Sequence, residues 1–303
     1  MSKKILLIDA NSIGWAHYYA NKLSYRGEET QTLFGLINTL RNYKLHLREF
    51  EPFVLWDSMA SWRYKIYDGY KSNRKSDDPQ KQEQRKSFSG QTLNAECAFS
   101  LLGVKQLRII GYEADDIAGY ITKTYRERKK DHQIMLVTGD KDWLQLLGDN
   151  VSWTDHRTNE IVTIDSFLDK TGYKTPLEFL HGKALQGDNS DCIPGVPKIG
   201  EKRAAEIVAK YGIFPDMLEK IREAEKVPAY EKSILEKESI EIINRNLGLM
   251  NLIDVEPPKN KDDILYKRGL LSEYGFKNFC GDYGFVSILG NLDTYLEPFR
   301  DKE

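Results

Sequence analysis

The sequence Leu107-Arg108-Ile109-Ile110-Gly111-Tyr112-Glu113-Ala114-Asp115-Asp116 joins a short apolar run to an acidic segment, and it indicates the fold of the first half of the chain. The apolar run predicts a buried strand over 107–110. A helix is predicted over 113–128, because apolar residues recur there at helical spacing, at Ile117, Tyr120, Ile121 and Tyr125. A buried strand followed directly by an amphipathic helix is the repeating unit of an α/β sheet.

Three more apolar runs have the length and composition of buried strands. They are Ile5–Ile8, Phe53–Trp56 and Ile134–Val137, and a further helix is predicted over Thr32–Leu47. Unbroken apolar strands that alternate with helices are typical of parallel sheets covered on both faces. The sequence therefore predicts an α/β fold with a mostly parallel central sheet flanked by helices. In such sheets, ligands bind beyond the carboxyl ends of the strands.

Acidic residues gather at those carboxyl ends. Each small acidic group alone could cap a helix or a turn, but together they form a set of nine: Asp9, Asp57, Glu113, Asp115, Asp116, Asp140, Asp142, Asp188 and Asp191. Two like charges about 4 Å apart repel by roughly 4 kcal/mol at an effective dielectric constant near 20. Such a cluster requires raised pKa values or bound cations. Oxygen ligands favour Mg²⁺ or Mn²⁺, and a pair of such ions suits phosphodiester cleavage.

The composition excludes several other classes of protein. The five histidines show no metal-ligand spacing, and the three cysteines are too few for a disulfide scaffold. No apolar run approaches the roughly 18 residues of a membrane span. We therefore expect a protein of a reducing compartment, the bacterial or host cytoplasm, with no membrane partner. The net charge of −2 in 303 residues does not argue against a nucleic-acid partner, because nine acidic residues are concentrated in one predicted site.

Two stretches depart from the strand–helix alternation. Residues Trp62–Ser87 lack an apolar period and are rich in Lys and Arg, which predicts a long, exposed and partly helical insertion. After about Thr175 only helical patterns remain, and they predict helices over Pro176–Gln186, Glu201–Tyr211, Phe214–Glu225 and Tyr230–Asn246. We therefore divide the chain into residues 1–175 and an all-helical region, 176–303.

The acidic motifs and their order along the chain resemble those of a known family. The matching segments are Leu7-Ile8-Asp9-Ala10-Asn11-Ser12, Val54-Leu55-Trp56-Asp57, Gly69-Tyr70-Lys71-Ser72-Asn73-Arg74, Gly111-Tyr112-Glu113-Ala114-Asp115-Asp116, Val137-Thr138-Gly139-Asp140-Lys141-Asp142, and Gly187-Asp188-Asn189-Ser190-Asp191 with the segment that follows it to Lys202. Together they resemble the 5′-nuclease, or flap endonuclease, superfamily. Similar members are the stand-alone bacteriophage 5′-exonucleases and the 5′-nuclease domain of bacterial DNA polymerase I.

The resemblance implies an active site with two or three divalent metal ions, Mg²⁺ or Mn²⁺. By motif position, the first metal would be held directly or through water by Asp9, Asp57, Glu113 and Asp115. The second metal would be held in the same way by Asp116, Asp140, Asp142, Asp188 and Asp191. Residues 1–175 would form the catalytic domain, and residues 176–303 would form a DNA-binding domain.

The resemblance also implies a helical arch over the site, at about residues 62–95. Lys71 and Arg74 match the cations of the family that contact the scissile phosphate, where a fixed positive charge stabilises the transition state. Arg63 matches a basic position of the family and is expected to contact DNA. Tyr70, beside Lys71, is expected either to stack on a base of the DNA or to pack. The basic residues Lys75, Lys81, Arg85 and Lys86 either guide a single strand of DNA or form a solvated face.

Residues of about 187–212 resemble the helix-three-turn-helix of the family. Gly195 and Gly200 would let the backbone approach DNA phosphates, and Lys198, Lys202 and Arg203 would add positive charge. Such binding reads the DNA backbone, and in the family a K⁺ ion can bridge this turn to a phosphate. The alternative is a helix pair that only packs. The chain departs from the family at Cys192, where Asn is usual.

The resemblance implies a Mg²⁺-dependent 5′→3′ exonuclease and structure-specific flap endonuclease. Its substrates would be DNA with 5′ flaps, nicks or ends, and also RNA–DNA hybrids, as in primer removal during replication. We expect a monomer that meets replication proteins. Two alternatives are a non-catalytic, structure-specific DNA-binding protein on the same fold and an RNA-directed nuclease of the related PIN type. The Gly195–Gly200 turn argues against the second.

Overall fold

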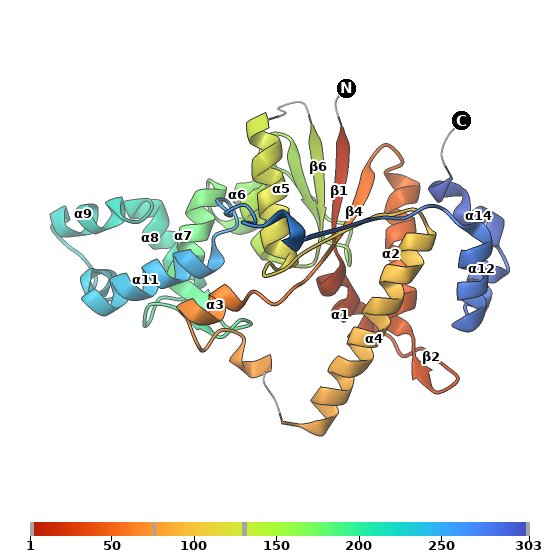
Figure 1. The fold of residues 1–303 in the computed structure, drawn as a ribbon. Helices are drawn as coiled ribbons and strands as arrows, with labels where there is room; N and C mark the ends of the chain where they lie inside the picture. The colour runs from red at the N-terminus through yellow and green to blue at the C-terminus, as the bar shows by residue number, and fades with distance from the viewer. Residues whose placement is uncertain (1–2, 75–76, 129–131, 301–303) are drawn as a thin grey trace.

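The computed structural model describes residues 3–74, 77–128 and 132–300, and its centre is a seven-stranded sheet (Figure 1). The strands lie in the order β11-β5-β4-β1-β6-β7-β8. Their bounds are β1 Lys4–Asp9, β4 Glu51–Trp56, β5 Lys105–Ile109, β6 Gln133–Val137, β7 Val151–Thr154, β8 Ile161–Val162 and β11 Ile264–Arg268. The four strands predicted from apolar runs are confirmed, with ends that shift by one or two residues.

Strands β5, β4, β1, β6 and β7 are parallel, while β11 and β8 run antiparallel at the two edges. The prediction of a mostly parallel sheet is therefore confirmed. Because β1, β4, β5 and β6 run in the same direction, their carboxyl ends meet at one edge of the sheet. Asp9 ends β1, and Asp57 directly follows β4.

Helices cover both faces of the sheet, which is why its central strands are apolar on both sides. Alternate residues of β1 point to opposite faces: Leu6 and Ile8 join one core, and Ile5 and Leu7 join the other. The first core lies under α1 (Ala10–Ala20), α2 (Gln31–His46) and α4 (Pro79–Leu101), and the second lies under α5 (Ala114–Arg128). A small hairpin, β2 (Ser24–Tyr25) and β3 (Glu28–Glu29), separates α1 from α2.

The predicted insertion is helical at both ends. Helix α3 (Ser61–Ile66) lies on the side of α11, and the 3₁₀ turn η1 (Ser72–Arg74) follows it. Helix α4 then returns to the sheet beside α1 and α2 (Figure 1). Asp78 caps α4 by accepting a hydrogen bond from the Gln80 amide. Lys75, one of the predicted DNA contacts, lies outside the described residues.

The predicted helices after Thr175 are present, although one is divided. They are α7 (Pro176–Gln186), α8 (Glu201–Tyr211), α9 (Asp216–Glu223), α10 (Ala229–Lys232) and α11 (Lys237–Met250). The single helix predicted over Tyr230–Asn246 is interrupted by the 3₁₀ turn η4 (Ser233–Leu235). This turn directs Ile234 into the core, where it is fully buried.

The all-helical prediction for 176–303 fails at three short strands. Strands β9 (Gly187–Asp188) and β10 (Ile193–Pro194) pair locally, and β11 pairs antiparallel with β5 as an edge strand of the central sheet. All five residues of β11 are exposed, so the strand lacks the apolar signal that marks the buried strands. None of the described helices is long and apolar enough to cross a membrane.

The last helices pack on the first half of the chain. They are α12 (Glu273–Asp282), α13 (Val286–Leu289) and α14 (Leu292–Leu296), and Figure 1 shows them beside α2 and α4. Phe276 and Leu296 are fully buried in the same core as Leu36 and Phe99. The end of the chain therefore completes the core beneath α2 and α4.

Phe276→Ala is expected to destabilise the whole protein by about 3–5 kcal/mol, because it leaves a cavity in that core. Tyr274→Ala is the matched control, since Tyr274 is 78% exposed on the same helix. Chemical denaturation followed by circular dichroism measures both. A Phe276→Ala protein that loses no more stability than Tyr274→Ala would show that the last helices fold independently of the sheet.

Candidate active site

The structure brings the nine predicted carboxylates to one region, where the carboxyl edge of the sheet faces the β9–β10 segment that follows α7. Asp9 and Asp57 follow β1 and β4, and Asp115 lies in the first turn of α5. A narrow cleft runs between this edge and the helices that follow residue 175. Its lining includes Glu113, Asp115, Asp142, Asp188 and Asp191, together with Arg63 and Tyr70.

Four of these carboxylates, Asp9, Asp57, Asp115 and Asp140, lie within 4 Å of no Lys or Arg nitrogen among the described residues. Neutral donors hold each of them in place. The Thr138 hydroxyl donates to Asp9 at 2.7 Å, the Ala114 amide to Asp57 at 2.8 Å, the Trp143 indole to Asp115 at 2.6 Å, and the Asp142 amide to Asp140 at 2.8 Å. These four carboxylates form the unneutralised cluster of the site.

Burial and mutual repulsion disfavour the charged forms of this cluster. Burial and the Asp57 carboxylate raise the pKa of Asp9 to about 7, and burial and Asp142 raise the pKa of Asp140 to about 7. Burial, followed by the Asp140 and Asp9 carboxylates, raises the pKa of Asp115 well above its ordinary value. The cluster therefore has more negative charge than the surrounding protein neutralises.

The other five carboxylates are paired with cations. Lys183 on α7 lies between Asp142, to which it forms a short ion pair, and Asp188, at 2.9 Å. Burial would lower the pKa of the Lys183 amine, but these two carboxylates raise it. The remaining pairs are Lys71 with Glu113, Arg74 with Asp191, and Arg63 with Asp116.

Arg63 and Tyr70 are both buried and bonded to carboxylates of the site. The guanidinium of Arg63 donates two hydrogen bonds to Asp116, at 2.7 and 2.6 Å, and a third to the Leu249 carbonyl. Arg63 is only 3% exposed and Tyr70 only 2% exposed, so neither side chain presents a surface to DNA in this structure, and Tyr70 has the packing role that the sequence left open. Tyr70 instead donates to Glu113 at 2.8 Å. Arg63 thus holds Asp116, in the first turn of α5, and Tyr70 holds Glu113, the residue before that helix.

Lys71 and Arg74 lie at the base of the insertion and face the carboxylates. The Lys71 amine is 2.7 Å from Glu113 and 3.7 Å from Asp191, and its backbone amide donates to the Asp191 carbonyl at 2.8 Å. Burial would lower the pKa of the Lys71 amine, but Glu113 and Asp191 raise it. Arg74 is 3.1 Å from Asp191 and more than half exposed. Positive charge is therefore fixed beside the acidic cluster.

The chemistry of the donor set fits hard divalent cations. Every donor of the cluster is a carboxylate oxygen, and the raised pKa values record negative charge that a cation would neutralise. Within residues 3–74, 77–128 and 132–300, no three Asp, Glu, His or Cys side chains converge closely enough to form a complete ligand set as they stand. Glu113, Asp142, Asp188 and Asp191 are instead engaged in ion pairs with Lys71, Lys183 and Arg74.

The predicted helix-three-turn-helix exposes its backbone at Gly200, whereas Gly195 packs closely against Gln186. Helices α7 and α8 are joined by a turn in which Val196 and Ile199 are buried, while Lys198, Lys202 and Arg203 are exposed. A side chain at Gly195 would meet the Gln186 backbone at 2.2 Å, so the close packing of this turn requires glycine. Nothing lies within 4 Å of the Cβ position of Gly200, which leaves its backbone open at the start of α8.

Cys192 adopts a left-handed backbone conformation, with φ of 56°. Asn tolerates this conformation better than Cys does, which gives a physical reason for the Asn that is usual in the family. The Cys192 amide bonds to the Asn189 carbonyl at 3.3 Å. The turn that holds Asp191 therefore forms in spite of the substitution.

Two side chains that contact the acidic residues escaped the sequence prediction. Lys183 has no motif of its own, and only folding brings α7 beside Asp142. Trp143 directly follows Asp142. An apolar residue after an acidic motif is expected to lie in the hydrophobic core, and only the structure shows that the Trp143 indole donates a hydrogen bond to Asp115. A shallow cleft next to Asp140 is lined by Trp15, Tyr19 and Arg157, and the Trp15 ring stacks on both Tyr19 and Phe88.

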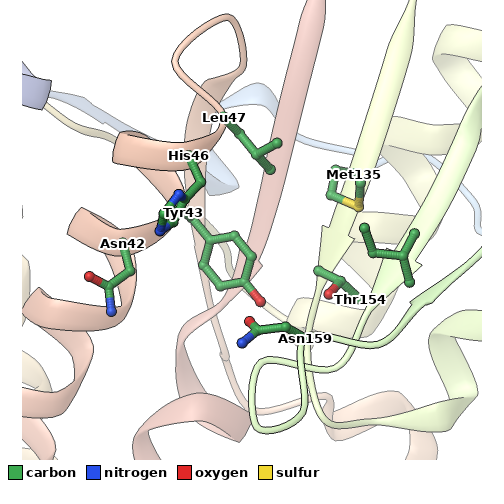
Figure 2. A pocket seen from close by; sticks show the side chains of 8 residues that line it. Asn42, Tyr43, His46, Leu47, Met135, Thr154 and Asn159 are labelled. Carbon is green, nitrogen blue, oxygen red and sulfur yellow. The ribbon is translucent and has the colours of Figure 1, made fainter.

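A separate cleft lies on the face of the sheet beside α2 (Figure 2). Tyr43 projects from α2 toward the strands, and its hydroxyl lies near Thr154 and Asn159. The lining has no carboxylate and no Lys or Arg, and its one titratable group besides Tyr43 is His46. It therefore lacks the groups that phosphodiester chemistry requires and is distinct from the acidic site.

An α/β sheet with a carboxylate cluster, adjacent cations and a glycine exposed at a helix start has the groups that a metal-dependent nuclease requires. Residues 4–172 match the family model "5'-3' exonuclease, N-terminal resolvase-like domain", and residues 174–267 match "5'-3' exonuclease, C-terminal SAM fold". The chain therefore belongs to the 5′-3′ exonuclease family, and the resemblance stated from its motifs is confirmed.

Individual proteins agree with this assignment. A 5'-3' exonuclease of Buchnera aphidicola subsp. Schizaphis graminum is 31% identical over 233 residues, which span 75% of this chain and 77% of that protein. A thermostable DNA polymerase I of Thermus filiformis is 32% identical over 289 residues, 95% of this chain but 33% of the polymerase. The bacteriophage T5 flap endonuclease, crystallised with DNA and metal ions, shares the fold with a TM-score of 0.69 and 20% identity over 98% of both chains.

In EDTA, the Asp140→Asn protein is expected to be more stable than the wild type, and the difference in stability is expected to grow as the pH rises. The pKa of Asp140 is about 7 in the folded protein and ordinarily 3.8. The folded state therefore retains a proton that the unfolded state loses, and wild-type stability falls between about pH 4 and pH 7. Because Asn cannot ionise, the Asp140→Asn protein does not lose stability in this way as the pH rises.

Thermal unfolding from about pH 5 to pH 8 measures the effect. Asp169→Asn, on the exposed face of α6 (Phe167–Thr171), is the matched control. A difference in Tm between Asp140→Asn and wild type that stays constant with pH would contradict a raised pKa at Asp140.

Proposed function

We propose that this chain is a Mg²⁺-dependent 5′→3′ exonuclease and flap endonuclease that hydrolyses phosphodiester bonds at 5′ ends and at junctions of single- and double-stranded DNA. The observation that carries the proposal is the unneutralised cluster of Asp9, Asp57, Asp115 and Asp140 beside the fixed cations Lys71 and Arg74. A non-catalytic DNA-binding protein would have no need to retain buried carboxylates that repel one another.

The unneutralised cluster would hold the divalent ions, two or three in number, with Glu113, Asp142, Asp188 and Asp191 contributing directly or through water. When bound, such ions activate a water molecule and stabilise charge on phosphate oxygens. Asp116 has both oxygens engaged by Arg63. We therefore assign Asp116 to the positioning of the α5 amino terminus, where its carboxylate also accepts from the Glu113 amide at 2.9 Å.

Lys183, Lys71 and Arg74 compete with the ions for the paired carboxylates. Lys183 forms ion pairs with Asp142 and Asp188. These ion pairs would break when a metal cation binds between the two carboxylates. Lys71 and Arg74 would then be free to turn from Glu113 and Asp191 toward the scissile phosphate. Their positive charge would stabilise the negative charge that develops on its oxygens.

In this proposal, the turn between α7 and α8 binds duplex DNA. The open backbone at Gly200 and the exposed side chains of Lys198, Lys202 and Arg203 suit contact with phosphates rather than with bases. A K⁺ ion would bridge this turn to a phosphate. The T5 flap endonuclease, which shares this fold, was crystallised with DNA. Residues 1–175 would thus cut, and residues in 176–303 would bind the duplex.

The substrates we propose are DNA flaps, nicks and 5′ ends, with RNA–DNA hybrids as a second class that a backbone-reading surface accepts. The role that fits these substrates is removal of 5′ segments, including RNA primers, during replication in the cytoplasm of the cell or phage host. One chain carries every proposed catalytic group, so a monomer suffices for cleavage.

Asp140→Asn is expected to lower the rate of flap cleavage by more than about a hundredfold, the upper end of what loss of an outer-shell metal partner costs. DNA binding is expected to persist. The assay uses 5′-labelled flap, nicked and RNA-primed duplexes with Mg²⁺, and Asp169→Asn is the matched control. Full activity of Asp140→Asn, or of the wild type in EDTA, would refute the proposal. A wild type that binds these substrates in Mg²⁺ without cutting them would favour the non-catalytic alternative.

Lys202→Glu is expected to weaken duplex binding at all sequences alike and to lower the slope of log affinity against log salt by about 1, the contribution of one phosphate contact. Lys277→Glu, an identical change on the exposed side of α12, is the control. Fluorescence anisotropy in EDTA across a salt series measures the slope. Equal slopes in the two variants would remove Lys202 from the DNA interface.

A further inference from the structure

Strand β11 leaves one edge of the central sheet open. It pairs only with β5 and stands last in the strand order among the described residues. All of its residues are exposed, including Leu265 at 43% and Tyr266 at 50%. An exposed edge strand with apolar side chains is a template for pairing with another strand.

The hydrogen bonds of β11 show which backbone groups face outward. The Asp263 carbonyl accepts from the Ile110 amide at 2.9 Å, and the Gly269 amide donates to the Val104 carbonyl at 3.4 Å. Because bonding to one neighbour recurs at every second residue of an antiparallel strand, Leu265 and Lys267 bond to β5. The amides and carbonyls of Ile264, Tyr266 and Arg268 therefore point to the open edge.

The charges along this strand are ordered. Asp262 and Asp263 precede it, apolar residues fill its centre, and Lys267 and Arg268 end it. Lys267 forms an ion pair with Glu96 at 2.7 Å, whereas Asp262 and Arg268 form none among the described residues. A strand that begins acidic and ends basic matches its own sequence when the two copies run antiparallel.

We propose that β11 is a docking surface for a second copy of this chain, through antiparallel pairing of two β11 strands about a two-fold axis. With Leu265 on the axis, Ile264 lies opposite Tyr266 of the other copy, and Asp262 lies opposite Arg268. In this register the outward backbone groups of Ile264 and Tyr266 face each other, which hydrogen bonding requires. Asp263 then also approaches Lys267.

The self-complementary charge order favours a second copy over an unrelated protein. A foreign strand would have to repeat the same acidic–apolar–basic order by coincidence, while this chain supplies it by symmetry. The two-fold axis stands perpendicular to the joined sheet, so the carboxyl edges of the two sheets lie at opposite ends. Neither acidic cleft is covered, and pairing leaves each nuclease site open.

One strand buries little surface, so the dimer is weak and forms with concentration. Sedimentation velocity of the full chain from about 1 µM to about 500 µM measures it, and we expect a shift from monomer to dimer within that range. Arg268→Asp places like charges opposite each other twice in the interface, and we expect it to raise the dissociation constant about tenfold or more.

The double variant Asp262→Arg with Arg268→Asp restores the complementary order, and we expect it to restore dimerisation. Arg222→Asp, the same substitution on exposed α9, should dimerise like wild type. Circular dichroism and flap cleavage, which the interface does not involve, should match wild type in all three variants. A wild type that stays monomeric over the whole range would overturn the proposal. So would a dimer that Arg268→Asp does not weaken, or one that the double variant does not restore.

Discussion

Repulsion among buried carboxylates is the constraint on which the rest of this structure depends. Four parallel strands end at one edge of the sheet, and their acidic ends bring Asp9, Asp57, Asp115 and Asp140 together in a low-dielectric environment. Such a cluster is stable in the folded protein only when its members hold protons or are neutralised by cations. The pKa of about 7 at Asp9 and Asp140 reflects the unfavourable free energy of ionising these buried, mutually repelling carboxylates.

The surrounding Lys and Arg side chains neutralise the other carboxylates of the site. Their ion pairs also connect parts of the chain that are far apart in the sequence. Lys183 links α7 to Asp142 on the sheet side, and Lys71 links the insertion to Glu113 and to the turn that holds Asp191. Arg63 ties α3 to α5 through Asp116. The site and the packing of the helical region against the sheet are thus one electrostatic system, and charge changes within it affect both.

The strands and the acidic positions were predictable because each depends on local sequence. A buried parallel strand needs an unbroken apolar run, and a carboxylate at its end is visible as the next polar residue. Strand β11 was not predictable in this way. It is exposed on both faces, and its place beside β5 depends on a chain reversal that no local pattern records. The break in the helix over Tyr230–Asn246 likewise reflects the burial of Ile234 rather than propensity.

The sequence by itself determined the parallel sheet, the gathering of nine acidic residues, the glycine turn between α7 and α8 and the family. These features depend on apolar periodicity, spacing and residue type, which are all local. Only the tertiary structure decided which carboxylates are neutralised, because ion pairs join residues far apart in the chain. It buried Arg63 and Tyr70 against carboxylates of the site and brought Lys183 beside Asp142 and Asp188. The sequence shows which residues are charged. Whether a charged side chain faces solvent or a carboxylate depends on its burial, which is set only when the chain folds.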